Sequence, residues 1–105
     1  MNSHDYASFA APLAHPGDHL REEYLPEFSL SIEALSDAMK LGDSAYLNQV
    51  VTGNSPVTAD IALRLAGVFG TSAEFWMNLQ AQHDLSREAI KNRAALNAIQ
   101  PVKRV

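Results

Sequence analysis

Three consecutive segments decide the fold: Ser31-Ile-Glu-Ala-Leu-Ser-Asp-Ala-Met39, Ser44-Ala-Tyr-Leu-Asn-Gln-Val-Val-Thr52 and Thr58-Ala-Asp-Ile-Ala-Leu-Arg-Leu-Ala-Gly-Val-Phe69. Each segment begins with Ser or Thr, which cap helix N-termini, and Gly53 and Gly70 stand where the second and third helices are expected to end. A short helix, a tight turn and a second short helix form a helix-turn-helix, which places its second helix in the major groove of DNA. The stretch therefore predicts a helix-turn-helix packed on a third helix.

Helical patterns continue on both sides of this stretch. Pro16 suits the first turn of a helix, and Pro26 is expected to end that helix. Thr71-Ser-Ala-Glu74 has the spacing of a capping box that opens a fifth helix, and Leu85-Ser86 is expected to open a last helix to about Ala98. No segment has a strand pattern. The sequence predicts an all-α domain of five helices plus a C-terminal helix.

The ends of the chain are less regular. Residues 1–14 show no periodicity and are predicted to be a flexible N-terminal arm, although Tyr6, Phe9 and Leu13 are apolar enough to dock on a core or a partner. Residues 15–101 are predicted to form the helix-turn-helix domain with its C-terminal helix, and residues 102–105 a tail.

Composition restricts the class of protein. The 105 residues include no cysteine, which excludes disulfides and cysteine-based metal sites or nucleophiles. No apolar run approaches the roughly 18 residues of a membrane helix. The N-terminus lacks the basic and apolar regions of a secretory signal. We therefore expect a cytoplasmic protein with no membrane partner. Its net charge of −4 is opposite in sign to that of most nucleic-acid-binding domains.

Catalytic and metal-binding patterns are incomplete. His15, His19 and Glu23 could form a partial metal site, but no further ligand follows at suitable spacing, so helix capping and surface polarity explain them better. Glu22 and Glu23 are adjacent on a helix and point apart, which does not suit an acid–base pair. The chain has no glycine-rich phosphate loop and no nucleophile elbow. We expect neither an enzyme nor a bound cofactor or metal.

Four segments carry a resemblance to a known family. They are His15-Pro-Gly-Asp-His-Leu-Arg-Glu-Glu-Tyr-Leu25, Val57-Thr-Ala-Asp-Ile-Ala-Leu-Arg-Leu-Ala66, Phe69-Gly-Thr-Ser-Ala-Glu-Phe-Trp-Met-Asn-Leu-Gln80 and His83-Asp-Leu85. Together they resemble the HigA antitoxins, which belong to the XRE-type, lambda-repressor-like helix-turn-helix proteins. The resemblance implies a homodimer that represses its own toxin–antitoxin operon. It also implies that the protein neutralises a HigB-type toxin, a RelE-like ribosome-dependent mRNA endonuclease, and is not itself a catalyst.

The resemblance also implies where two copies pair. Family dimers pair largely through the helix that corresponds to residues 75–82 here. We expect Phe75 to lie mostly in the core and the interface to lie along the rest of this helix. The predicted interface residues are Trp76, Met77, Leu79, Gln80 and His83. Leu79 is also expected to be mostly core, and in the alternative interpretation Phe75, Trp76 and Leu79 simply complete the core of the monomer.

The predicted DNA-reading face departs from the family pattern in two ways. One more residue than usual lies near Lys40–Asp43, and no Lys or Arg occurs between Lys40 and Arg64. Over Leu30–Leu63, four acidic residues stand against Lys40 alone, a net charge of −3. Neutral groups can still bind phosphates, and Asn or Gln can bridge the edge of adenine. The predicted DNA-binding residues are Ser31, Ser44, Ala45, Tyr46, Asn48, Gln49 and Asn54.

Two functions follow from this sequence. The first is a DNA-binding repressor of its own operator that is also an antitoxin. The alternative is a dimeric protein-interaction module with the same fold that has lost operator binding, in which residues such as Tyr46, Asn48 and Gln49 are ordinary polar surface. The cation-poor face favours the alternative.

Overall fold

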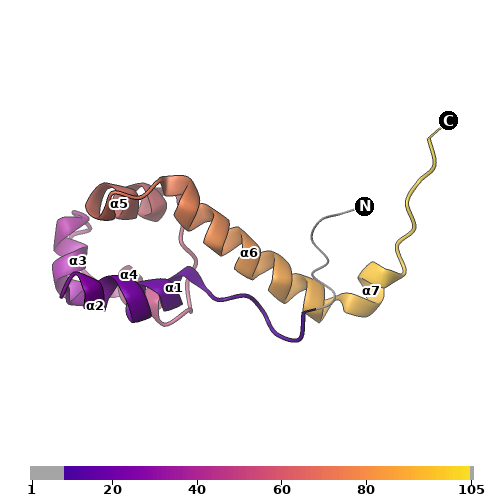
Figure 1. Cartoon of the computed structure of the whole chain (residues 1–105), viewed down its shortest axis with the longest axis horizontal. Helices are drawn as coiled ribbons and strands as arrows, with labels where there is room; N and C mark the ends of the chain where they lie inside the picture. The colour runs from indigo at the N-terminus through magenta and orange to yellow at the C-terminus, as the bar shows by residue number, and fades with distance from the viewer. Residues whose placement is uncertain (1–8, 105) are drawn as a thin grey trace.

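The computed structural model describes residues 9–104, and within that range it contains helices and connecting segments but no strand. The elements in chain order are α1 (Pro16–His19), η2 (Leu20–Tyr24), α2 (Leu25–Glu27), α3 (Ile32–Ala38), α4 (Ala45–Val51), α5 (Ala59–Phe69), α6 (Ala73–Lys91) and α7 (Arg93–Asn97). Helices α1 to α5 form a rounded lobe, and α6 extends from that lobe toward α7 and the C-terminus (Figure 1). The predicted all-α fold with a helix-turn-helix is confirmed.

The first helical run is longer than the sequence predicts. α1, η2 and α2 follow one another without a gap, so Pro26 lies inside the run instead of ending it. The turn before Pro26 is a π-helix, in which Leu25 N–H donates to Leu20 O. This wider turn gives room at the point where a proline ring otherwise meets the carbonyl four residues earlier. The run ends at Ser29, which has a left-handed φ of 52°.

Trp76 is the centre of the core. Its side chain has no exposed area, and the rings of Tyr24, Phe69 and Phe75 pack around it. Its Nε1–H donates to Thr71 Oγ1 at 2.7 Å, which satisfies the one polar atom of the indole. Placing Trp76 at a dimer interface was therefore wrong, and the alternative of a residue that completes the monomer core is correct for it.

The cap of α6 lies one residue later than the Thr71–Glu74 spacing predicts. Ser72 is the N-cap, and its Oγ accepts a hydrogen bond from Phe75 N–H at 3.1 Å. The hydroxyl of Thr71 is unavailable as a cap because it accepts the hydrogen bond from the Trp76 indole. Ser31 and Thr58 cap α3 and α5 as predicted.

The predicted fifth helix and the predicted C-terminal helix are largely a single helix in the structure. α6 continues through Leu85-Ser86 to Lys91, so the predicted helix start at Ser86 was wrong. Ser86 is fully buried, and its Oγ donates to His83 O at 2.9 Å and accepts from Leu13 N–H at 2.8 Å. A hydroxyl engaged in this way does not cap a new helix. At 1.5 Å per residue, the 19 residues of α6 span about 28 Å.

The N-terminal segment is bonded to α6 and α7 where the structure describes it. Leu13 N–H donates to Ser86, Leu13 O accepts from the His83 ring at 2.7 Å, and Arg93 donates to Phe9 O at 2.7 Å. Phe9 and Leu13 are thus bonded to α7 and α6 through their backbone atoms, whereas the flexibility of residues 1–14 as a whole stays a prediction. Tyr6 lies outside the described residues.

Candidate nucleic-acid interface

The outer face of α4 carries the residues predicted to contact DNA. Leu47, Val50 and Val51 are buried, which leaves the opposite side of the helix to solvent. The exposed residues on that side are Ala45, Tyr46, Asn48, Gln49 and Thr52. The sequence periodicity therefore identified the outward face of this helix correctly.

Three side chains on this face already have partners within the chain. Asn48 Nδ2 donates to Ser44 O at 3.0 Å, Gln49 Oε1 accepts from Ser55 Oγ at 2.6 Å, and the Tyr46 hydroxyl donates to Pro56 O at 2.6 Å. These bonds leave the amide oxygen of Asn48 and the amide nitrogen of Gln49 for a new partner. Bidentate contact with adenine needs both groups of one amide. Gln49 Oε1 keeps a second lone pair for such a contact, whereas Asn48 Nδ2, which also lies 3.3 Å from Ser44 Oγ, must release a local bond.

The remaining predicted residues lie at helix termini near this face. Ser31 caps α3 by accepting from Ala34 N–H at 3.0 Å. Ser44 is the N-cap residue of α4, but Asp43 makes the side-chain bond, accepting from Ala45 N–H at 3.0 Å. Asn54 follows α4 and is exposed. Contact of these residues with DNA stays a prediction.

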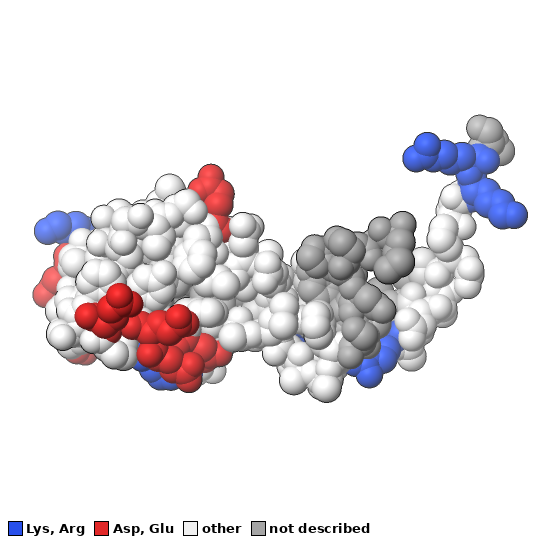
Figure 2. All heavy atoms as spheres, in the orientation of Figure 1, with Lys and Arg blue, Asp and Glu red and all other residues white. Residues whose placement is uncertain are grey.

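The electrostatic character of this region is acidic. Glu33, Asp37 and Asp43 line a shallow hollow with Ser36 and Ser44, between the start of α3 and the start of α4. Figure 2 shows Asp and Glu side chains on the lobe, where a few Lys and Arg side chains also lie, and a further group of Lys and Arg at the end of the C-terminal tail. Phosphate attraction from the lobe itself is therefore weak.

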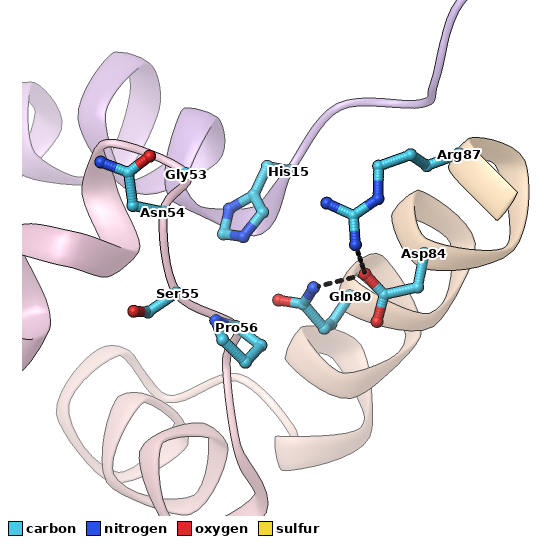
Figure 3. A pocket seen from close by; sticks show the side chains of 8 residues that line it. All are labelled: His15, Gly53, Asn54, Ser55, Pro56, Gln80, Asp84 and Arg87. Atoms are coloured by element: carbon cyan, nitrogen blue, oxygen red, sulfur yellow. Dashed lines mark hydrogen bonds and ion pairs between the residues drawn. The ribbon is translucent and has the colours of Figure 1, made fainter. Parts of the chain in front are cut away.

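A cavity of about 200 Å³ lies between the loop after α4 and the middle of α6 (Figure 3). Its lining residues are His15, Gly53, Asn54, Ser55, Pro56, Gln80, Asp84 and Arg87. Gln80 Oε1 accepts from Val57 N–H at 2.7 Å, and Gln80 Nε2 donates to Asp84 at 2.9 Å. Sequence reasoning missed Arg87, because nothing in the sequence connects the last predicted helix with this loop.

Gln80 is a second correction to the predicted dimer interface. Its side chain is buried, and both ends of its amide are bonded inside the monomer, to Val57 and Asp84. It is therefore not available to a second copy. Of the other predicted residues, Met77 is exposed, whereas Leu79 and His83 are half-buried. Leu85 is 52% exposed on the same helix and was not predicted. A dimer through α6 stays a prediction.

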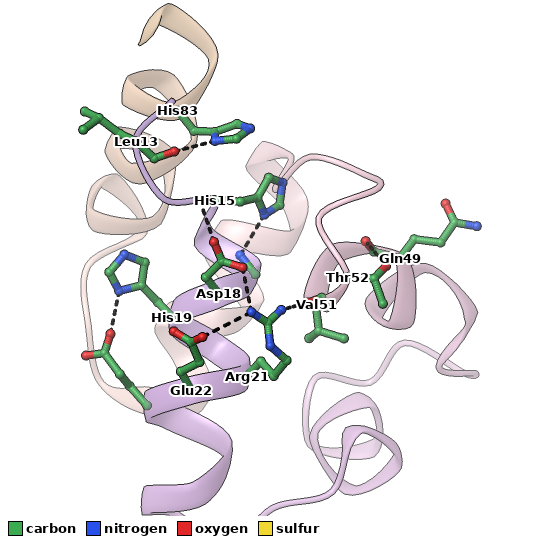
Figure 4. A network of polar contacts seen from close by, with 12 residues as sticks. Leu13, His15, Asp18, His19, Arg21, Glu22, Gln49, Val51, Thr52 and His83 are labelled. Carbon is green, nitrogen blue, oxygen red and sulfur yellow. Dashed lines mark hydrogen bonds and ion pairs between the residues drawn. The ribbon is translucent and has the colours of Figure 1, made fainter. Parts of the chain in front are cut away.

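His15 joins α1 to α6 and to the loop after α4 (Figure 4). The side chain is only 5% exposed, and its Nδ1 accepts from Gly17 N–H at 2.8 Å, so it caps α1 as the sequence predicts. The His83 ring lies edge-on, with centroids 5.0 Å apart. Burial lowers the pKa of His15, and the neighbouring His83 lowers it further, so the neutral form is favoured.

Arg21, which belongs to η2, joins Asp18 of α1 to the end of α4. It donates to Val51 O at 2.7 Å and to Asp18 Oδ1 at 2.9 Å. Burial raises the pKa of Asp18, but hydrogen bonds from Arg21 and from the His15 backbone outweigh this effect, and the net pKa lies below its ordinary value. The first helix therefore fixes the position of α4 through charged hydrogen bonds.

Among residues 9–104, no three His, Asp or Glu side chains lie together as metal ligands. None of the helices in that range combines the length and hydropathy needed to cross a bilayer.

A capped helix, a tight turn and a second helix with a polar outer face, packed on α5, define a helix-turn-helix domain. No protein-family model matches the chain. The chain is 41% identical over 91 residues to Virulence-associated protein I of Dichelobacter nodosus, covering 87% of this chain and 82% of that protein. It is 33% identical over 69 residues to Antitoxin HigA-1 of Vibrio cholerae, covering 66% of this chain and 64% of that one.

Solved structures agree with these relatives. The Pseudomonas aeruginosa antitoxin HigA, solved with the higBA promoter, is 38% identical with a TM-score of 0.81, covering 87% of this chain and 99% of that one. The antitoxin GraA is 32% identical with a TM-score of 0.81, covering 89% of this chain and 100% of that one. The chain belongs to the HigA family of antitoxins.

Proposed function

We propose that this protein is a DNA-binding repressor that recognises the operator of its own operon and acts as the antitoxin of a HigB/RelE-like mRNA endonuclease. The observation that carries the proposal is the exposed polar face of α4 in a chain 38% identical to a HigA antitoxin solved with its promoter. A second relative, GraA, has also been solved with its operator, at 34% identity and a TM-score of 0.76.

In this proposal α4 enters the major groove. Asn48 exchanges its bond to Ser44 for contacts with a base edge, and Gln49 can keep its bond to Ser55 while it makes such contacts. Ser31, Ser44 and Asn54, at the helix termini, bind phosphates and fix the position of the domain on the duplex, which carries no sequence information by itself.

Two copies pair through α6 in the proposed homodimer. Met77 is exposed and Leu79 and His83 are half-buried, so they can be covered by a partner, and Leu85 extends this surface. A twofold dimer presents two copies of α4, which suits a palindromic operator whose half-sites lie about one helical turn apart.

The proposed toxin is a basic protein. The net charge of −4 and the acidic lobe favour a basic partner by charge complementarity. The antitoxin has no catalytic role in this scheme, and it acts in the cytoplasm, where operator DNA and ribosome-dependent endonucleases are found.

The second candidate is an interaction module that has kept the fold and lost operator binding. It is favoured by the net charge of −3 over Leu30–Leu63. In that case the protein acts by binding a toxin or another protein, and α4 has no DNA partner.

Fluorescence anisotropy distinguishes the two candidates. The purified protein is titrated against its own upstream region and a scrambled duplex at two salt concentrations. We expect preferential, salt-sensitive binding that is lost in an Asn48→Ala/Gln49→Ala double variant. The matched control is Asn97→Ala/Gln100→Ala, which removes two exposed amides far from α4. Equal, negligible binding to both duplexes would leave the interaction module as the function.

A further inference from the structure

Two arginines near α4 are already engaged in structural bonds. Arg21 donates to Val51 O and pairs with Asp18, and Arg64 pairs with Asp60 and donates to Met39 O at 2.7 Å. Lys40 is exposed in the turn before α4, at the opposite end of that helix from the loop at residues 53–56. The C-terminal end of α4 therefore needs a cation from elsewhere in the fold, since phosphate contacts supply much of the affinity for DNA.

Arg87 is such a cation. It belongs to α6, and it lines the cavity opposite the loop that follows α4 (Figure 3). Its side chain is 57% exposed, and its contact with Asp84 is 4.0 Å long, at the limit of an ion pair. An exposed pair of this length is worth little, so the guanidinium can change partner at small cost.

The cavity adjoins the DNA-reading face directly. Ser55 lines the cavity, and its hydroxyl donates to Gln49 Oε1 on the outer face of α4 at 2.6 Å. Asn54 lines the same cavity and is exposed. When α4 lies in a major groove, the loop at its C-terminal end approaches the phosphates that border the groove.

We propose that Arg87 binds a backbone phosphate of the operator at this cavity, and so supplies the cation that the recognition helix lacks. The proposal rests on the proposed DNA-binding function. The volume of about 200 Å³ exceeds the share of several water molecules, at about 30 Å³ each, and so accommodates a phosphate group. The planar guanidinium can make two parallel hydrogen bonds to phosphate oxygens.

Two neighbouring groups set the charge at the site. The negative charge of Asp84 repels a phosphate. Gln80 Nε2 donates to the Asp84 carboxylate at 2.9 Å and holds that carboxylate on the α6 side of the cavity. His15 is neutral near pH 7, because burial lowers its pKa, and so contributes no charge. In the free protein Asp84 thus keeps the guanidinium beside the cavity, and the phosphate replaces this weak contact.

The test measures operator affinity of the full chain across salt concentrations for wild type, Arg87→Gln and Lys91→Gln. Lys91 is the matched control, since it lies one turn further along α6 and is not part of the cavity lining. We expect Arg87→Gln to weaken binding to operator and scrambled duplex alike, and to reduce the salt slope by about 0.9, the value for one phosphate contact. Its penalty should therefore shrink about 3.5-fold between roughly 50 and 200 mM salt. Lys91→Gln should leave the slope unchanged.

Two further variants separate direct contact from other effects. Asp84→Asn removes the opposing charge and should tighten binding severalfold. Arg87→Lys keeps the charge and should restore the slope with only part of the affinity. Inorganic phosphate at constant ionic strength distinguishes the two sources of a phosphate group. Failure of inorganic phosphate to displace the operator supports the proposal, whereas displacement from the wild type but not from Arg87→Gln would assign the cavity to a free anion and overturn it.

Each outcome has a distinct meaning. Tight wild-type binding with an unchanged slope in Arg87→Gln, or with the same loss in Lys91→Gln, overturns the role of Arg87 and leaves the repressor function intact. Absence of specific wild-type binding overturns the proposed function itself, and this inference with it.

Discussion

The contact between α1 and α4 leads to a sharp prediction at Gly17. This residue packs so closely on α4 that a Cβ atom would lie 1.9 Å from Val50 O and 2.9 Å from Val50 C. Neither atom can move independently, because both are backbone atoms of a helix. We therefore expect Gly17→Ala to push α1 away from α4 by more than 1 Å, since essentially no real Cβ contact is shorter than 3.0 Å.

The magnitude follows from what this shift disrupts. Overpacking of a close contact costs about 1–3 kcal/mol. The shift also lengthens the 2.7 Å hydrogen bond from Arg21 to Val51 O, and losing a hydrogen bond to a charged group costs about 1.5 kcal/mol or more. The free energy of unfolding should fall by about 3–4 kcal/mol in total, a large part of the roughly 5–15 kcal/mol of a typical domain.

Urea denaturation followed by Trp76 fluorescence measures this effect. With an m-value of about 1.5 kcal/mol/M, the transition midpoint should fall by about 2 M. Gly67→Ala is the matched control, because Gly67 lies within α5 and nothing stands within 4 Å of its Cβ position. That substitution should stabilise by about 0.5–1 kcal/mol through helix propensity. A Gly17→Ala midpoint equal to that of wild type would refute the described packing of α1 on α4.

Three other changes have defined outcomes. Thr71→Val removes the acceptor of the buried Trp76 N–H and should lower the free energy of unfolding by about 1–3 kcal/mol in chemical denaturation. As pH falls through 6.5, unfolded His15 takes up a proton before the folded form, whose pKa is lowered, so stability should decline below that pH. His15→Asn keeps a capping side chain and should flatten this decline, and parallel pH profiles would contradict the assignment. Arg64→Ala removes donors to Met39 O and Lys40 O and should lower the thermal midpoint, whereas an unchanged midpoint would show that these bonds contribute nothing.

Local signals were sufficient for most of the fold. Ser31 and Thr58 cap their helices by short-range bonds within three residues, which a sequence pattern contains. The buried stripe of α4 likewise follows from spacing alone. These features were predicted because both partners of each interaction are close in the chain.

The errors occurred where a distant partner decides the outcome. Ser86 has the sequence of a helix cap, but its hydroxyl is bonded to Leu13, 73 residues away in the chain. Trp76 was expected at the surface because its packing depends on rings from the first helix and from α5. The sequence did not identify Arg87 as a candidate site residue. Arg87 meets the loop at residues 53–56 only in the folded chain, where both line the same cavity.

The turn between α3 and α4 is the place where the family resemblance predicts one residue more than the usual spacing. Ser36 Oγ donates to Asp43 O at 2.6 Å, so a side chain of α3 holds the backbone just before α4. On the other side of the turn, Arg64 holds Met39 O from α5. Between these two points Lys40 O also accepts from Arg64, Leu41 N–H donates to Ser36 O, and Lys40 and Gly42 have left-handed φ angles.

Side-chain bonds from Ser36 and Arg64 therefore hold the two ends of the turn between α3 and α4. Within the turn, nothing lies within 4 Å of the Cβ position of Gly42. We expect the length of the chain to be adjustable next to Gly42 while the bonds at both ends keep α4 in place, so that the length of the connection and the orientation of the polar face of α4 are separate properties of this turn.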